Sequence, residues 1–83
     1  MARENEHPLT KHLRENRGMM TRGWARFHGF NPDVTALVVY TGYFDADIIK
    51  KLREDGLYEF LYPDVRAKIE EAEKSKKGEN GNG

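Results

Sequence analysis

The chain has 83 residues, equal numbers of basic and acidic side chains, and no cysteine. A chain of this length forms one small domain, and without cysteine it has no disulfide or thiolate metal site to support its core. Charged residues make up 34% of the sequence, and no apolar run approaches the roughly 20 residues that span a bilayer. The N-terminus lacks the apolar stretch of a signal peptide, so we expect a cytoplasmic protein outside the membrane.

The first predicted helix begins at Pro8, after a polar segment, residues 1–7, that we expect to be flexible. Leu9 and Leu13 are four residues apart and therefore lie on one face of this helix. Lys11 and Arg14 point away from that face, and Gly18 follows the last helical residue. Residues 8–17 thus predict a short amphipathic helix.

The stretch from Thr21 to Gly42 predicts two helices joined by a tight turn. Trp24, Ala25 and Phe27 supply the apolar positions of the first of these helices, with Trp24 in the core. Gly29 suits the left-handed residue that ends a helix. Gly23, inside the helix, costs roughly 1 kcal/mol relative to alanine, and we expect another backbone to lie close to it. Phe30, just after the turn, can fold back over Trp24 or Ala25.

The second helix of this pair is predicted from Pro32 to about Tyr40. Asn31 is a good N-cap, and Pro32 occupies the first helical position, where its missing N–H has no consequence. Taken alone, the run TALVVYT could also be a buried strand. We favour a helix because the sequence offers no second convincing strand to pair with it.

The rest of the chain predicts one well-defined helix and a weaker one. Asp45 caps the helix ADIIKKLRED, which ends at Gly56, and Leu57 is placed to contact Leu52 as in a Schellman motif. Tyr58 to Tyr62 is a short helical turn or an irregular packed segment. A final helix is expected from Asp64 to about Ser75, and residues 76–83 form a polar, disordered tail. These helices predict a single domain, residues 8–75.

Two helices joined by three or four residues around a glycine are typical of a helix-turn-helix, whose second helix enters the major groove in DNA-binding proteins. The run WARFHGFNPD, Trp24 to Asp33, resembles the small helix-turn-helix regulators encoded by Mu-like and other temperate phages. The resemblance extends over roughly residues 9–60. It implies an all-α, lambda-repressor-like fold of four to five short helices and a role as a phage or mobile-element transcriptional regulator that binds double-stranded DNA.

The resemblance also implies which residues face DNA. The groove-facing positions are Asn31, Asp33, Val34 and Leu37, with Thr21 and Arg22 at the start of the preceding helix. Arg22 and Arg26 are four residues apart, so both lie on one helix face and can hold phosphates. Lys11 and Arg14 could extend this basic surface.

The charge distribution agrees with a basic N-terminal surface, although the net charge is zero. Residues 1–30 hold six Lys and Arg against three Asp and Glu, whereas residues 31–83 hold eight against eleven. One such module buries only about 600 to 1,000 Å² on DNA. We therefore expect a homodimer, with Tyr58 to Tyr62 and the final helix as its contact surface.

A non-enzymatic module for protein–protein interaction, such as an adaptor or inhibitor, is the alternative. An exposed apolar surface at Val38, Tyr40 and Phe44 would favour this alternative, whereas a continuous basic face on the first three helices would favour DNA. No residue pattern indicates a catalytic site or a cofactor. The three histidines match no common metal-ligand spacing, so no metal site is expected.

Overall fold

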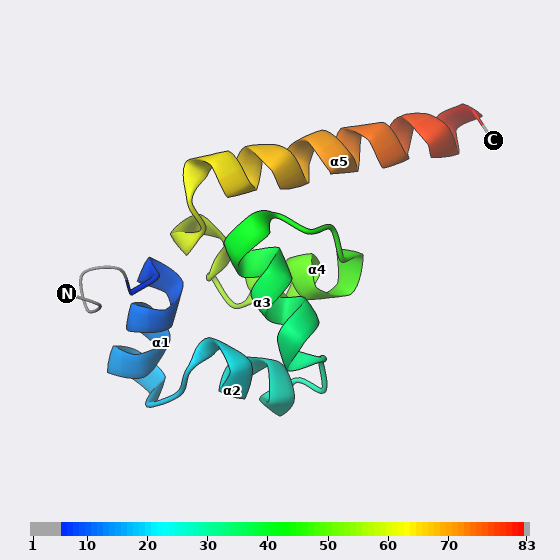
Figure 1. Ribbon diagram of the computed structural model, residues 1–83. Helices are drawn as coiled ribbons and strands as arrows, with labels where there is room; N and C mark the ends of the chain where they lie inside the picture. Colours follow the sequence, from blue (N-terminus) through cyan, green and yellow to red (C-terminus); the bar gives the residue numbers. More distant parts are fainter. Residues whose placement is uncertain (1–5, 83) are drawn as a thin grey trace.

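The computed structural model describes residues 6–82, and from residue 76 onward only the backbone of a helix. This part of the chain is all helical, without strands, as predicted (Figure 1). The helices are α1 (Pro8–Arg17), α2 (Thr21–Phe27), α3 (Pro32–Thr41), α4 (Ala46–Glu54), the 3₁₀ turn η2 (Tyr58–Phe60) and α5 (Pro63–Asn82). The first four form the body, and α5 crosses one end of it and projects beyond it (Figure 1).

The helix boundaries follow from the capping residues. The Asn31 side chain accepts hydrogen bonds from the backbone N–H groups of Asp33 and Val34, at 2.8 and 3.1 Å, and so caps α3. Asp45 caps α4 in the same way, through the N–H of Ile48. Gly42 has the left-handed conformation that ends α3. These three predictions are confirmed.

The N-terminal segment is more ordered than its polar sequence indicated. His7 is only 1% exposed and caps α1, because its Nδ1 accepts a hydrogen bond from the N–H of Leu9 at 3.0 Å. Its ring lies between those of Tyr40 and Tyr62, with centroid distances of 5.0 and 4.6 Å. The expected flexibility of residues 1–7 is therefore wrong for His7, and residues 1–5 lie outside the described part of the chain.

The core gathers apolar side chains from every helix, and Trp24 is its largest fully buried member. The ambiguous run after Pro32 is helical, and its β-branched residues Thr35, Val38 and Val39 face inward. Full burial of one such aliphatic side chain contributes roughly 1.5–3 kcal/mol. The core members are Leu9, Leu13, Trp24, Val38, Val39, Ile48, Ile49, Leu52, Leu57, Leu61, Val65 and Ile69.

Three expectations about α2 and α3 are corrected. Phe27 is 74% exposed rather than buried, whereas Phe30 packs against Trp24 as expected, with ring centroids 5.9 Å apart. Gly23 has no backbone near it, because an added Cβ would meet only the Met19 side chain at 3.7 Å. Val38 is fully buried and contributes nothing to an exposed apolar surface.

The C-terminal third packs onto the body through η2 and the first turns of α5. Leu57 donates its N–H to the carbonyl of Leu52 at 2.8 Å, which confirms the expected helix end after α4. Helix α5 is assigned to Asn82, beyond the expected end at Ser75, so most of the predicted tail, residues 76–83, belongs to a helix. Lys76, Lys77 and Glu79 favour helix, and the glycines among these residues do not end it. Residue 83 is not described.

None of the helices in the described part of the chain is long and apolar enough to cross a membrane.

Candidate nucleic-acid interface

Helices α2 and α3 make the most extensive helix–helix contact among the described residues. The turn between them is closed by two backbone hydrogen bonds, from Gly29 to the Arg26 carbonyl at 3.0 Å and from Phe30 to the Ala25 carbonyl at 2.8 Å. Gly29 has a φ of 79°, a conformation that glycine adopts without the penalty of a side chain. Ala25 is fully buried, so its small side chain lets the two helices approach closely.

This packing leaves one face of α3 open to solvent. Asp33, Leu37 and Tyr40 are exposed, and Ala36 between them is half-buried. These positions follow the three- and four-residue spacing that places side chains on one face of a helix. Leu37 and Tyr40 keep 46% and 51% of their surface exposed, so α3 presents an aromatic and aliphatic surface with a single carboxylate at its N-terminal end.

The two arginines of α2 both lie on the molecular surface. Arg22 donates from Nη1 to Oδ1 of Asp33, which joins the start of α2 to the start of α3. Both side chains of this pair are more than half exposed, so the pair contributes little to stability, about 0–1 kcal/mol. Arg26 makes no ion pair with another described residue and is available to a ligand.

Three residues expected to face DNA are instead used within the fold. Thr21 is 5% exposed, and its hydroxyl shares a 2.6 Å hydrogen bond with that of Thr10 on α1. Asn31 is exposed, but its side-chain oxygen caps α3. Val34 is half-buried and packs against the core. Local capping and packing therefore account for these three residues.

The remaining basic residues of the prediction lie on α1. Lys11 and Arg14 are both exposed, and Arg14 forms a two-point contact with Glu6, at 2.7 and 3.0 Å. This contact raises the pKa of the Arg14 guanidinium above its ordinary value, chiefly through the hydrogen bonds to Glu6.

Tyr40 lies on the exposed face of α3 but was predicted from the sequence only as part of an apolar contact surface, not among the DNA-facing residues. It lines a shallow groove of about 310 Å³ together with Thr10, Met20, Thr21, Arg22 and Ala36. Its hydroxyl lies 3.4 Å from that of Thr10, next to the Thr10–Thr21 pair. The spacing from Asp33 through Leu37 to Tyr40 was visible in the sequence and could have identified it.

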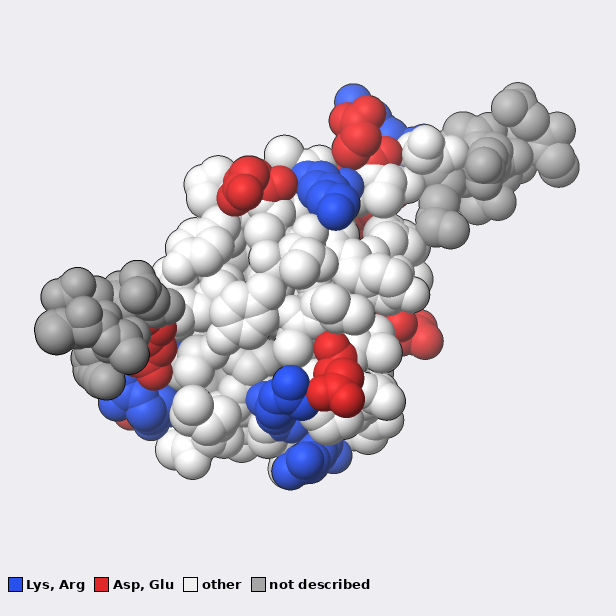
Figure 2. Space-filling model, viewed as in Figure 1, with Lys and Arg blue, Asp and Glu red and all other residues white. Residues whose placement is uncertain are grey.

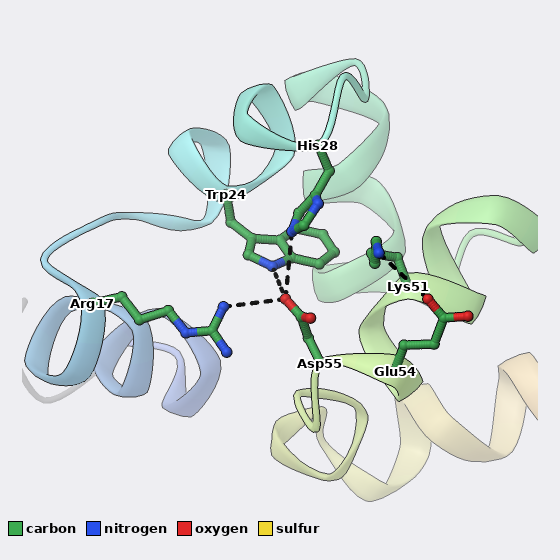
Figure 3. A network of polar contacts seen from close by, with 6 residues as sticks. All are labelled: Arg17, Trp24, His28, Lys51, Glu54 and Asp55. Atoms are coloured by element: carbon green, nitrogen blue, oxygen red, sulfur yellow. Dashed lines mark hydrogen bonds and ion pairs between the residues drawn. The ribbon is translucent and has the colours of Figure 1, made fainter.

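A partly buried polar junction joins α2 to α1 and to the end of α4 (Figure 3). Oδ2 of Asp55, just after α4, accepts a hydrogen bond from Nε1 of Trp24 at 2.8 Å and another from Arg17 at 3.1 Å. Nε2 of His28 lies 3.4 Å from the same oxygen, an ion-pair distance without hydrogen-bond geometry. The Trp24 hydrogen bond is the main reason that the pKa of Asp55 is lowered, with Arg17 adding to it.

Charge is divided into small groups rather than one basic face. Figure 2 shows a mostly uncharged surface on the side from which α3 is seen, with Lys and Arg in separate groups near its margins. Several arginines carry an acidic partner. These pairs are Arg14–Glu6, Arg17–Asp55, Arg22–Asp33 and Arg53–Glu73.

The three histidines lie in different environments. His7 is buried between two tyrosine rings, His12 stacks on Phe60 at 4.4 Å, and His28 contacts Trp24 and Asp55. Within the described residues, no three His, Asp or Glu side chains are grouped so that they could hold a metal ion.

Comparison of the chain with protein-family models, curated proteins and solved structures gave no significant match. The relationship to phage regulators that Trp24 to Asp33 implies therefore stays a prediction.

Proposed function

We propose that this protein binds double-stranded DNA in a sequence-specific way, with α2 and α3 as a helix-turn-helix, and acts as a transcriptional regulator of phage or mobile-element type. One observation carries the proposal: the close α2–α3 packing leaves a face of α3, with Asp33, Leu37 and Tyr40, exposed beside Arg22 of α2. An α-helix fits the major groove of B-DNA, which is about 12 Å wide.

The residues take different roles in this proposal. Arg22 and Arg26 hold phosphates, which sets the position of the protein on the duplex without reading sequence. Asp33, Leu37 and Tyr40 face the base edges, where Leu37 and Tyr40 can contact thymine methyl groups. Asn31 acts indirectly, because its cap fixes the start of α3. Lys11 and Arg14 on α1 are secondary phosphate contacts.

A dimer on a two-fold site remains part of the proposal, because one such module buries only about 600 to 1,000 Å² on DNA. Within the expected contact segment, Tyr62 is 42% exposed, whereas Leu61 is buried. The Tyr58 hydroxyl donates a hydrogen bond to the Glu70 carboxylate at 2.8 Å, and the Arg53 guanidinium lies over the Tyr58 ring. Tyr62 and the outer face of α5 are thus the parts of this segment that a second copy can contact.

The test is fluorescence anisotropy with a labelled duplex of random sequence at low and moderate salt. We expect binding that weakens steeply as salt rises, since each phosphate contact releases counterions. The double variant Arg22→Ala/Arg26→Ala should bind far more weakly. The double variant Lys50→Ala/Lys51→Ala is the matched control, because it loses the same charge from α4, outside the proposed DNA and dimer surfaces.

Two results would contradict the proposal. One is the absence of binding even at low salt, by protein that circular dichroism shows to be folded. The other is an equal loss of binding in the two double variants. It would indicate that DNA is attracted by the overall charge of the protein and not by a particular surface.

A protein-interaction module is the second candidate function, and a specific observation favours it. Large apolar side chains are exposed over α2, α3 and the following connector, and the charge near them is mostly paired. Exposed apolar surface of this kind often marks a protein contact. These side chains are Met20, Phe27, Leu37, Tyr40 and Tyr43. Absence of DNA binding by folded protein would direct the search to such a partner.

A further inference from the structure

The acidic residue on the exposed face of α3 requires an explanation if this face approaches DNA. The Asp33 side chain is 80% exposed, at the second residue of α3. An isolated carboxylate at this place would be repelled by phosphates. The structure supplies a compensating charge, because Arg22 Nη1 lies 2.5 Å from Oδ1 of Asp33.

The carboxylate is held in a defined place from two sides. The Asp33 backbone N–H donates a hydrogen bond to the side-chain oxygen of Asn31 at 2.8 Å, which fixes the first turn of α3. The Arg22 contact then engages Oδ1 alone, and Oδ2 accepts no hydrogen bond from another described residue. The pair therefore presents one exposed acceptor whose negative charge is balanced by its neighbour.

The chemistry of base edges selects the partner of such an acceptor. An ionised carboxylate accepts hydrogen bonds and donates none. In the major groove, the N4 amino group of cytosine is a donor, and acidic side chains pair with it. The N6 amino group of adenine also donates, but the neighbouring N7 is an acceptor and repels a carboxylate. Guanine and thymine present acceptors at their major-groove edges, which a carboxylate cannot satisfy.

We propose that Asp33 is a specificity-determining residue that accepts a hydrogen bond from cytosine N4, and that Arg22 bridges this carboxylate to a backbone phosphate. The guanidinium has five N–H donors, so it can keep Asp33 and still donate to a phosphate oxygen. The inference rests on the proposed DNA binding and adds to it a base and a residue that reads it.

The test compares the duplexes that the wild type, Asp33→Asn and Asp47→Asn select from a random pool. Asp47 is the matched control, because it is an exposed aspartate at the second residue of α4. We expect one strongly preferred C·G pair in each half-site for the wild type and for Asp47→Asn. For Asp33→Asn we expect that preference to be lost or moved to A·T, since asparagine pairs with adenine.

The magnitude is measured by titrating the selected duplex and its single-base variant. Replacing the preferred C·G pair should weaken the wild type by about 5- to 150-fold and leave Asp33→Asn almost unaffected. Arg22→Ala should weaken binding to both duplexes. Circular dichroism of each variant checks that the helices are intact.

The possible outcomes distinguish a failure of the role given to Asp33 from a failure of the proposed DNA binding. Specific binding with the same C·G preference in the wild type and Asp33→Asn would overturn the role of Asp33 and leave DNA binding standing. An identical loss of preference in Asp47→Asn would overturn it as well. Failure of every folded variant to bind duplex DNA would overturn the proposed function and this inference together.

Discussion

At the scale of single residues, Asp55 links three helices through one carboxylate oxygen. Replacing it with alanine leaves the N–H of the fully buried Trp24 without its acceptor. An unsatisfied buried donor costs about 1–3 kcal/mol. We therefore expect Asp55→Ala to lower the free energy of urea unfolding by an amount in that range. Glu71→Ala, at an exposed position of α5, should change it by less than about 0.5 kcal/mol. Equal effects of the two substitutions would contradict this role of Asp55.

His7 gives stability a dependence on pH. Burial lowers its pKa below the ordinary value of 6.5, and the backbone of Val39 partly opposes this shift. The folded state therefore binds the proton less readily than the unfolded state. The contribution of neutral His7 is complete above pH 6.5 and is lost as pH falls below 6.5 through the folded-state pKa.

The measurement is urea unfolding between pH 7.5 and pH 5. Stability of the wild type should fall over this range, and His7→Asn should flatten the fall while keeping a side-chain oxygen at the cap. Phe27→Ala, at a largely exposed position without an ionisable group, is the control and should retain the wild-type slope. An unchanged slope in His7→Asn would mean that His7 does not stay neutral in the fold.

At the scale of helices, Gly42 fixes the approach of α5 to the end of α3. A Cβ at Gly42 would lie 3.1 and 3.2 Å from side-chain carbons of Lys68 and 3.3 Å from the Val65 carbonyl oxygen. Gly18 has a similar left-handed conformation but open space around it. We expect Gly18→Ala to cost about 1–2 kcal/mol for its conformation alone, and Gly42→Ala to cost more. Equal shifts of the urea midpoint would show that α5 moves aside freely.

The helices were more predictable from the sequence than their contacts. Asn31, Asp45 and Gly42 act within a few residues of themselves, so their capping roles were recognisable. The burial expected of Phe27 was wrong, because it depends on how α2 meets α3, which the helical spacing alone does not determine. The Asp55 junction joins residues up to 38 positions apart, and no local pattern marks it.

The exposed surface was predictable in part. The resemblance gave Asp33 and Leu37 as groove-facing, and both are exposed. The same prediction included Thr21 and Val34. The Thr21 hydroxyl instead shares a buried hydrogen bond with that of Thr10, and Val34 packs against the core. Tyr40 follows the same spacing as Asp33 and Leu37, but it was interpreted as an apolar contact residue because of its aromatic ring.

At the scale of the whole molecule, the net charge of zero and the paired arginines exclude a strong overall attraction to DNA. In the proposed function, attraction to DNA depends on local groups, namely Arg22, Arg26, Lys11 and Arg14. With up to four phosphate contacts per copy, we expect log K to fall with log salt concentration at a slope of about −4 at most. A markedly steeper slope for a single copy would indicate that other basic residues also contact DNA.

The central claim is that α2 and α3 together contact duplex DNA, and amide NMR during titration with a duplex tests it most directly. We predict that the largest shift changes occur from Arg22 to Arg26 and from Asp33 to Tyr40, with α4 almost unaffected. Shift changes confined to η2 and α5, or none at all at low salt, would contradict the claim.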